Sequence, residues 1–278
     1  MGKQTAIVWC DHTFNPWWGC QKVSPGCANC YAEAFAKRTG HDVWGGSHRF
    51  FGDAHWREPL EWEREAAGLG ERRRVFCASM ADVFEVEPQL VAPRRRLLDL
   101  IGATQALDWL LLTKRPENVK GMLREVGLEL PPNVWLGASV EDQERADERI
   151  PKLLKIPARI RFLSCEPLLG PVDLRSFGSI DWVIIGGESG PKARVCEVGW
   201  IRSLVRQCLE TGVAPFVKQL GARPFESGFG LLDDEDPDAL DVCPIRLRDK
   251  KGADPFEWPE DLRIQSFPER LETEAKES

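Results

Sequence analysis

The sequence lacks a long apolar run, an excess of positive charge and a dense set of cysteines, and each absence excludes a class of protein. None of its 278 residues form a stretch near the roughly 18 apolar residues of a membrane span, and Met1 to Val8 lack the apolar core of a signal peptide. The net charge of −7 provides no general attraction for nucleic acid. Nine cysteines are too few for a disulfide framework. We therefore expect a cytoplasmic protein with free thiols and no membrane partner.

Three of the cysteines, Cys20, Cys27 and Cys30, nevertheless lie within eleven residues. The residues between the first two include Ser24-Pro25-Gly26, which favours a tight turn because proline fixes φ before the corner and glycine accepts the position after it. The run that follows, residues 31–37, consists of good helix formers. Thiolates at a helix N-terminus are stabilised by backbone N–H groups, so the pattern favours metal ligation.

Four interpretations of these thiols stay open. A structural zinc ion needs four ligands, and because the chain has one CxxC pair here, His12, His41, His48 or His55 would have to complete a Cys3His site. A disulfide pair is disfavoured, and inert buried thiols describe the other cysteines better (Cys10, Cys77, Cys196, Cys208 and Cys243). The fourth interpretation is an iron–sulfur cluster with one iron left without a protein ligand. Such clusters normally take four thiolates, so a missing ligand indicates function.

Apolar runs alternate with amphipathic segments from residue 74 onward. We expect strands at 5–10, 74–79, 108–113, 133–139, 161–165, 180–186 and 215–219, and helices at 31–39, 88–100, 116–126, 141–154 and 200–209. Continuous apolar strands between amphipathic helices are typical of parallel sheets covered by helices. The predicted fold class is α/β, a partial (βα) TIM-type barrel of about six or seven parallel strands, with an N-terminal cysteine loop and a C-terminal extension.

The expected domain organisation follows from this alternation of strands and helices. Residues 1–222 form the partial barrel, and the weakly patterned residues 41–70 form an insertion or lid within it. Residues 223–278 form a C-terminal extension, with an acidic loop at 233–238 and a disordered tail from Glu269.

Polar residues follow six of the expected strands. In parallel barrels the carboxyl ends of the strands meet at one edge, where the chemistry lies. Any one of these residues is as well explained as a helix cap or a loop residue, but six strands ending this way indicate one functional ring. Its members are Ser79 and Asp82, Thr113 and Lys114, Ser139 and Glu141, Ser164 and Glu166, Glu188 and Ser189, and Lys218 and Gln219.

The cysteine loop, with its CxxC followed by an aromatic residue, resembles the signature of radical S-adenosylmethionine (SAM) enzymes, although six residues rather than three separate the first two cysteines. The order of the motifs resembles the spore photoproduct lyase branch. The fuller series is most similar to a phage- and bacterium-borne three-Cys-motif family of unassigned reaction. It comprises residues 15–20, Ser79-Met-Ala-Asp82, 112–115, 136–139, 164–168, 186–190 and 216–219.

The resemblance implies a [4Fe–4S] cluster bound by Cys20, Cys27 and Cys30, and SAM bound beside it. It implies that Tyr31 lies beside the adenine. The other residues expected to contact SAM or a ligand are Ser79, Asp82, Thr113, Lys114, Ser139, Glu166 and Gly187, with Gly187 permitting close approach of a ligand. Cys165, Glu188 and Lys218 are the expected catalytic residues. Cys165 is either a hydrogen-atom donor, as a cysteine is in the lyase branch, or a buried structural thiol, which is the commoner state of such a residue.

The implied activity is reductive cleavage of SAM to a 5′-deoxyadenosyl radical that acts on a nucleobase or nucleotide, in phage DNA modification or repair. Trp17, Trp18 and Trp44 would stack an extruded base. The arginine runs 72–74 and 94–96 would contact phosphates, or they lie on a solvated helix or strand edge, as such runs more commonly do. The implied partners are a nucleotide or DNA substrate and an external electron donor of the flavodoxin or ferredoxin type. The sequence does not indicate an oligomeric state.

Two other functions stay open. A zinc-stabilised nucleic-acid-binding protein would use the same thiols for structure. A barrel hydrolase would use Glu166 and Glu188 as paired carboxylates.

Overall fold

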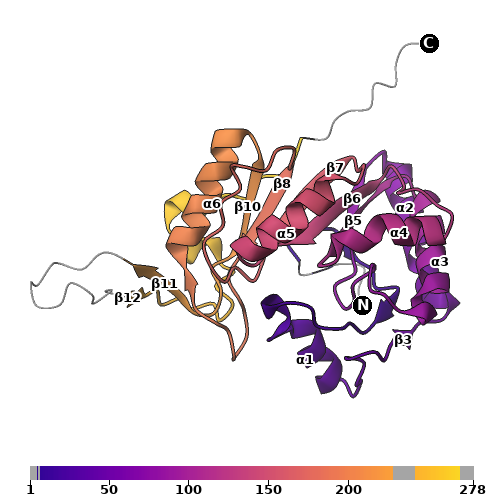
Figure 1. The fold of residues 1–278 in the computed structure, drawn as a ribbon, viewed down its shortest axis with the longest axis horizontal. Helices are drawn as coiled ribbons and strands as arrows, with labels where there is room; N and C mark the ends of the chain where they lie inside the picture. Colours follow the sequence, from indigo (N-terminus) through magenta and orange to yellow (C-terminus); the bar gives the residue numbers. More distant parts are fainter. Residues whose placement is uncertain (1–4, 6, 228–241, 270–278) are drawn as a thin grey trace, which may run out of the picture.

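The computed structural model describes residues 5, 7–227 and 242–269, and its centre is a seven-stranded parallel sheet that forms a half-barrel (Figure 1). Its strands, in spatial order, are β1 (His12–Thr13), β4 (Arg73–Cys77), β5 (Leu107–Thr113), β6 (Val134–Ser139), β7 (Ile160–Cys165), β8 (Trp182–Gly186) and β10 (Ala214–Gln219). The predicted partial (βα) barrel is confirmed. The acidic loop predicted at 233–238 and the tail after Glu269 lie outside the described residues.

Helices pack on the outer face of this sheet. They are α2 (Asp53–Leu69), α3 (Val91–Gly102), α4 (Pro116–Glu125), α5 (Gln143–Leu154) and α6 (Val198–Thr211), while α1 (Tyr31–Arg38) lies apart from them, below the sheet in Figure 1. Short 3-10 helices lie at η1 (Pro25–Cys27), η2 (Pro88–Leu90), η3 (Pro255–Glu257) and η4 (Glu260–Leu262). None of the helices in the described ranges has the length and apolar character needed to cross a membrane.

Two small sheets complete the architecture. The first pairs β2 (Trp17–Trp18) with β3 (Arg49–Phe50) in antiparallel fashion. The second contains β9 (Cys196–Glu197), β11 (Pro224–Ser227) and β12 (Val242–Pro244), and it projects from the side of the half-barrel beside α6 (Figure 1).

The two faces of the main sheet have separate cores, because side chains alternate along a strand. On β5, Trp109 and Leu111 join the outer core with the helices, whereas Leu110 faces the interior. The interior is filled with aromatic residues. Position 137 is a glycine because a Cβ there would lie 2.4 Å from the Phe162 ring, which occupies that space. The half-barrel is therefore a packed solid at its centre, not a channel.

The predicted strands and helices agree with the structure except at the N-terminus. The strand predicted at 5–10 is wrong, because the edge strand β1 begins at His12. Trp9 packs instead on Phe76, at a ring-centroid distance of 4.5 Å, and on Trp182 at 6.1 Å. Ile7, Trp9 and Cys10 are apolar because they contact the interior core, and this contact does not require a strand.

Half of the segment predicted as an insertion or lid, residues 41–70, is the helix α2. Its buried side chains Trp56, Trp62 and Ala66 belong to the outer core, and Gly70 ends the helix with a φ of 67°. This helix covers the sheet as the other barrel helices do. The role of the remaining residues 41–52 stays a prediction.

Residues near the C-terminus pair with the other edge of the sheet. The Val217 N–H donates to the Ile264 carbonyl at 2.8 Å, and the Ser266 N–H donates to the Pro215 carbonyl at 2.9 Å. Phe267 then packs on Trp182, with ring centroids 5.4 Å apart. Part of the predicted C-terminal extension is thus attached to β10.

Candidate functional site

The carboxyl ends of β4, β5, β6, β7, β8 and β10 form one edge of the half-barrel, which we call the mouth. The residues following these strands include Ser79, Lys114, Glu141, Glu166 and Glu188. This edge carries the polar ring that the sequence predicts, because parallel strands bring their carboxyl ends together.

The cysteine loop, residues 20–30, is attached to the β4 and β5 side of the mouth. The Tyr31 hydroxyl, directly after the loop, donates to the Ser79 carbonyl at 2.8 Å. Arg115, which follows β5, donates from Nη2 to the Gln21 carbonyl at 2.8 Å. Both contacts join residues that are far apart in sequence, so the fold itself determines where the loop lies.

The same loop is attached to the opposite side of the mouth. The Gly26 N–H donates to Glu141 Oε1 after β6 at 3.3 Å, and Asn29 Nδ2 donates to Glu188 Oε2 after β8 at 3.0 Å. Arg194 Nη1 donates to the Pro25 carbonyl at 2.9 Å. The cysteine loop therefore spans the mouth, with contacts to the ends of four of its strands.

The three loop cysteines differ from the others in exposure. Cys20, Cys27 and Cys30 are half-buried, Cys243 is exposed, and the remaining cysteines (Cys10, Cys77, Cys165, Cys196 and Cys208) are buried. No group of three or more Cys, His, Asp or Glu residues among the described ranges is arranged to bind a single metal ion. In an iron–sulfur cluster each cysteine binds a different iron, so the thiols need not converge on one point.

Two of the four histidines have no free ring nitrogen for a zinc ion. His48 contacts Glu85 through Nε2 at 3.2 Å and Gln89 through Nδ1 at 2.9 Å. His55 contacts Glu58 through Nδ1 at 3.1 Å and the Asn15 carbonyl through Nε2 at 2.9 Å. A Cys3His site using either residue would have to break these hydrogen bonds.

Asp82 is buried beneath the cysteine loop and joins the ends of β4 and β5. Its Oδ1 accepts from the Thr113 hydroxyl at 2.7 Å and from the Phe84 N–H at 3.0 Å, and its Oδ2 accepts from the Lys114 N–H at 3.0 Å and from Arg115 Nη1 at 2.8 Å. Asp82 and Thr113 are thus brought together, but the chain itself occupies the carboxylate. Their predicted contact with SAM stays a prediction.

Arg115 belongs to the motif 112–115, but the sequence alone indicates no role for it. Its guanidinium is buried between Asp82 and the cysteine loop, and Nη1 lies 3.9 Å from Cys20 Sγ. The pKa of the Cys20 thiol is raised to about 12, mainly by burial and also by Asp82, while Arg115 lowers it. Metal binding to this thiol would therefore release a proton.

Glu141 supports the central part of the loop. Its Oε2 pairs with Arg149 Nη1 at 2.9 Å, and the same nitrogen donates to the Ser139 carbonyl at 2.9 Å. Burial alone would raise the pKa of Glu141, but Lys114 and Arg149 lower it, as do hydrogen bonds from Ser24 and Gly26. The carboxylate is therefore charged, and Lys114 lies close enough to influence it.

Glu188 is buried and paired with Arg194, which donates to it from Nε at 2.9 Å and from Nη2 at 2.6 Å. Burial would raise the pKa of Glu188, but the hydrogen bonds from Arg194 and Asn29 outweigh it, so the pKa is lowered. A lowered pKa favours a fixed anion over a proton donor. Its predicted catalytic role stays a prediction.

Glu166 and Lys218 form a half-buried ion pair at the ends of β7 and β10. Lys218 Nζ lies 2.6 Å from Glu166 Oε1 and 2.8 Å from Oε2. Lys218 lies where the pairing of β10 with β8 is irregular, between Val217 and Gln219. The structure thus brings together two residues that were predicted separately.

The reason given for Gly187 needs correction. A Cβ at this position would lie 2.2 Å from the Leu220 carbonyl oxygen and 3.0 Å from Cys196 Cβ. Glycine is needed here because the chain's own backbone passes close by, and no ligand is needed to explain it.

Ser79 and Tyr31 flank the start of α1. The Ser79 hydroxyl lies 3.1 Å from Asn15 Nδ2, and Asn15 also accepts from the Met80 N–H at 2.7 Å. The Tyr31 side chain is 58% exposed although its hydroxyl is hydrogen-bonded. An exposed aromatic face directly after the CxxC pair is the position expected for a residue that stacks on a ligand.

The prediction that Cys165 lies at the mouth is wrong. The side chain is fully buried in the outer core, on the helix side of the sheet, and burial raises its pKa. Its neighbour Ser164 occupies the alternate position on β7. A thiol on the helix side cannot exchange hydrogen with a substrate at the mouth.

The aromatic residues predicted to contact nucleic acid are mostly buried, and the basic ones are paired with other groups of the protein. Trp17 and Trp18 are buried, with 0% and 7% of their surface exposed, so neither can stack an extruded base. Trp44 is half-buried against Trp18's cluster. The arginines of the two runs pair with acidic or backbone groups: Arg72 with Asp108, Arg73 with Glu65, Arg74 with Asp11, Arg95 with Asp99, Arg96 with Asp53, and Arg94 with the Val83 and Glu85 carbonyls.

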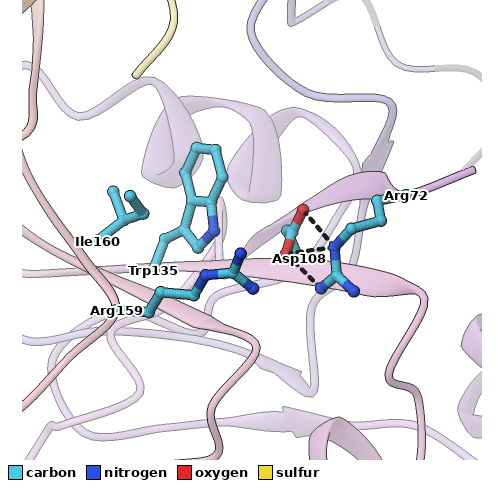
Figure 2. Close-up of a pocket in the computed structure, with 5 residues that line it drawn as sticks. All are labelled: Arg72, Asp108, Trp135, Arg159 and Ile160. Atoms are coloured by element: carbon cyan, nitrogen blue, oxygen red, sulfur yellow. Dashed lines mark hydrogen bonds and ion pairs between the residues drawn. The ribbon is translucent and has the colours of Figure 1, made fainter. Parts of the chain in front are cut away.

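A small polar pocket lies at the other end of the half-barrel. It is lined by Arg72, Asp108, Trp135, Arg159 and Ile160, which lie at or before the amino ends of their strands, and Figure 2 shows the Arg72 guanidinium directed at the Asp108 carboxylate. Arg72 Nε lies 3.1 Å from Asp108 Oδ1. Since this pocket is opposite the mouth, the arginine run 72–74 does not contribute to the site.

Comparison with known proteins gives one family match and several structural likenesses. A family model described as protein of unknown function (DUF5131) matches residues 4–254. No curated protein matches the chain.

Among solved structures, a cysteine-to-alanine variant of spore photoproduct lyase with dinucleoside spore photoproduct is 14% identical, with a TM-score of 0.48 over 81% of this chain and 68% of that one. A tyrosine-to-phenylalanine variant gives the same values. A cysteine-to-serine variant, also 14% identical, gives a TM-score of 0.45 over 75% of this chain, which spans 55% of that protein's length.

Proposed function

The chain belongs to the DUF5131 family, and we propose that it is a radical SAM enzyme that binds a [4Fe–4S] cluster through Cys20, Cys27 and Cys30. One observation carries the proposal: the loop bearing these half-buried thiols is hydrogen-bonded across the mouth of a parallel half-barrel. Catalytic groups of such folds lie at this edge. A loop whose thiols only stabilised the fold would not need to span the strand ends.

The residues present fit a cluster that has one iron open. The loop supplies three thiols, and His48 and His55, two of the histidines that could complete a zinc site, are hydrogen-bonded to other groups of the protein. When bound, the cluster and SAM supply a reductively generated 5′-deoxyadenosyl radical. The protein's part is to bind and orient both ligands.

Several residues have proposed roles in binding SAM. The exposed Tyr31 ring suits contact with the adenine, and Lys114 and Ser139 offer a cation and a hydroxyl at the adjacent strand ends. The Glu166–Lys218 pair carries both charges at the ends of β7 and β10, which matches the zwitterionic amino acid end of SAM.

We extend the proposal to a nucleobase or nucleotide substrate, in phage DNA modification or repair, and to an external donor of the flavodoxin or ferredoxin type. The motif resemblance supports this substrate class. Because Trp17, Trp18 and the arginine runs are occupied, substrate contacts are assigned to the mouth alone.

The barrel hydrolase is disfavoured by the charges at the mouth. It requires Glu166 and Glu188 as a paired acid and base, but each is held in an ion pair, with Lys218 and Arg194 respectively. A general acid needs a raised pKa, whereas the pKa of Glu188 is lowered.

The test is anaerobic purification with iron, sulfide and zinc analysis, followed by addition of dithionite and SAM and measurement of 5′-deoxyadenosine. We expect about four irons and four sulfides per chain, with 5′-deoxyadenosine formed. Cys27→Ala should lose both, whereas Cys243→Ala, which removes an exposed thiol outside the loop, should retain both. Stoichiometric zinc, or no SAM cleavage by the reconstituted protein, would show that the proposal is wrong.

The substrate class is tested in the same assay. Single-stranded DNA, nucleotides and a peptide are added separately, and the rate of 5′-deoxyadenosine formation is compared with the rate without addition. A rise with DNA or nucleotide supports the substrate proposal, and a rise with peptide alone contradicts it.

A further inference from the structure

We infer that Arg115 is a positioning residue for Cys20 that raises the reduction potential of the bound cluster; this inference rests on the proposed function. Arg115 lies 95 residues after Cys20 in sequence, and the fold places its Nη1 3.9 Å from the Cys20 sulfur. No other loop cysteine in the described ranges has an arginine within hydrogen-bonding distance. Cys27 has the Ser24 hydroxyl at 3.8 Å instead.

The guanidinium is fixed on three sides. Nη1 donates to Asp82 Oδ2 at 2.8 Å as well as facing Cys20, and Nη2 donates to the Gln21 carbonyl at 2.8 Å. Asp82 is held in turn by Thr113 at 2.7 Å. Because 7% of Arg115 is exposed, water does little to screen its charge. The Arg115 guanidinium is therefore held in one orientation, with Nη1 facing the Cys20 sulfur.

The sign of the effect follows from charge. Reduction adds an electron to the cluster, and a nearby cation that donates to a ligand sulfur stabilises the reduced form more than the oxidised form. The negative groups Asp82 and Glu85 also act on Cys20 and oppose this effect. Without Arg115, both carboxylates act without this counter-charge, so the potential falls.

The guanidinium has a second effect, on geometry. By binding both Asp82 and the Gln21 carbonyl, Arg115 connects the first half of the cysteine loop to the end of β5. Lysine at this position retains the charge but cannot make the forked contacts. The two variants therefore separate the contribution of charge from that of orientation.

The experiment is an EPR-monitored redox titration, with mediators, of the reconstituted parent, Arg115→Gln, Arg115→Lys and the control Arg202→Gln. Arg202 is a partly buried arginine paired with Glu226 and Asp261, away from the loop. For Arg115→Gln we expect the reduced-to-oxidised ratio at a fixed potential to fall about tenfold, a shift of about 59 mV for one electron. Arg115→Lys should recover part of the shift, and Arg202→Gln should match the parent.

A parent protein that binds no cluster would contradict the proposed function, and this outcome is separate from the test of Arg115. An Arg115→Gln protein with full iron content and the parent potential would overturn the inference. If Arg115→Gln does not retain the cluster, Arg115→Met, which also removes the charge, decides: a potential lower than the parent's supports the inference, and an unchanged potential with the EPR signal of the parent overturns it.

Discussion

Replacing Asp82 by asparagine should strongly destabilise the protein even before any cofactor binds. The carboxylate accepts from Thr113 and Phe84 at Oδ1 and from Lys114 N–H and Arg115 at Oδ2. An asparagine whose oxygen takes the place of Oδ1 would direct its NH2 group at the Lys114 N–H and at Arg115, which are both donors. It also leaves the Arg115 cation buried without its counter-charge, since the paired side chains are 7% and 8% exposed.

The expected magnitude is that of breaking a buried ion pair, about 3–5 kcal/mol. Urea unfolding measures it: with a slope of about 3 kcal/mol/M, the midpoint should fall by about 1–1.7 M at constant slope. The control is Asp99→Asn, which removes an exposed pair with Arg95 and should cost about 0–1 kcal/mol.

A double variant tests the reason. The double variant Asp82→Asn with Arg115→Gln contains no uncompensated charge. Its loss of unfolding free energy should therefore be smaller than the sum of the losses in the two single variants. If Asp82→Asn costs no more than Asp99→Asn, or if the two single losses add without coupling, the pair is not the buried link between β4 and β5 that its geometry indicates.

Two further predictions concern other parts of the mouth. Gly187→Ala should lower the free energy of unfolding by about 1–3 kcal/mol or more, because its Cβ would lie 2.2 Å from the Leu220 carbonyl oxygen. The control Gly121→Ala, on open helix surface, should raise the free energy of unfolding by about 0.5–1 kcal/mol. Equal effects of the two substitutions in thermal unfolding would contradict this reasoning. Glu188 has a lowered pKa, so its stabilisation is present above the unfolded-state pKa, about 4.3, and is lost as the pH falls through the lowered value. Glu188→Gln should therefore be less stable than the parent at pH 7 and approach it in acid. A difference that does not depend on pH would argue against the Arg194 pairing as its cause.

Much of the fold could be predicted from sequence because the strands are continuous apolar runs. The predicted strands at 108–113 and 161–165 agree with β5 and β7 to within one residue at each end. The N-terminal strand failed because Trp9 is apolar for a different reason, contact with the interior core. Composition does not distinguish the two causes.

The site was predictable in its position but less so in its details. A strand end can be located from sequence, but the direction of a side chain depends on a register of one residue, and Cys165 faces the helices for that reason. Arg115 and Arg194 escaped notice because their partners lie elsewhere in the chain: Arg115 contacts Gln21, and Arg194 contacts the Pro25 carbonyl. Such pairings are decided by folding and leave no local pattern.

The pairing of residues 264–266 with β10 has a consequence for solubility. An edge strand offers unpaired N–H and C=O groups that a second chain can use to extend the sheet. Here Ile264 and Ser266 occupy the positions of such a neighbour, and Phe267 covers the aromatic residues beside it. The described C-terminal residues thus act as a built-in stop to intermolecular β-association, and a chain shortened before Ile264 would present that edge to its neighbours.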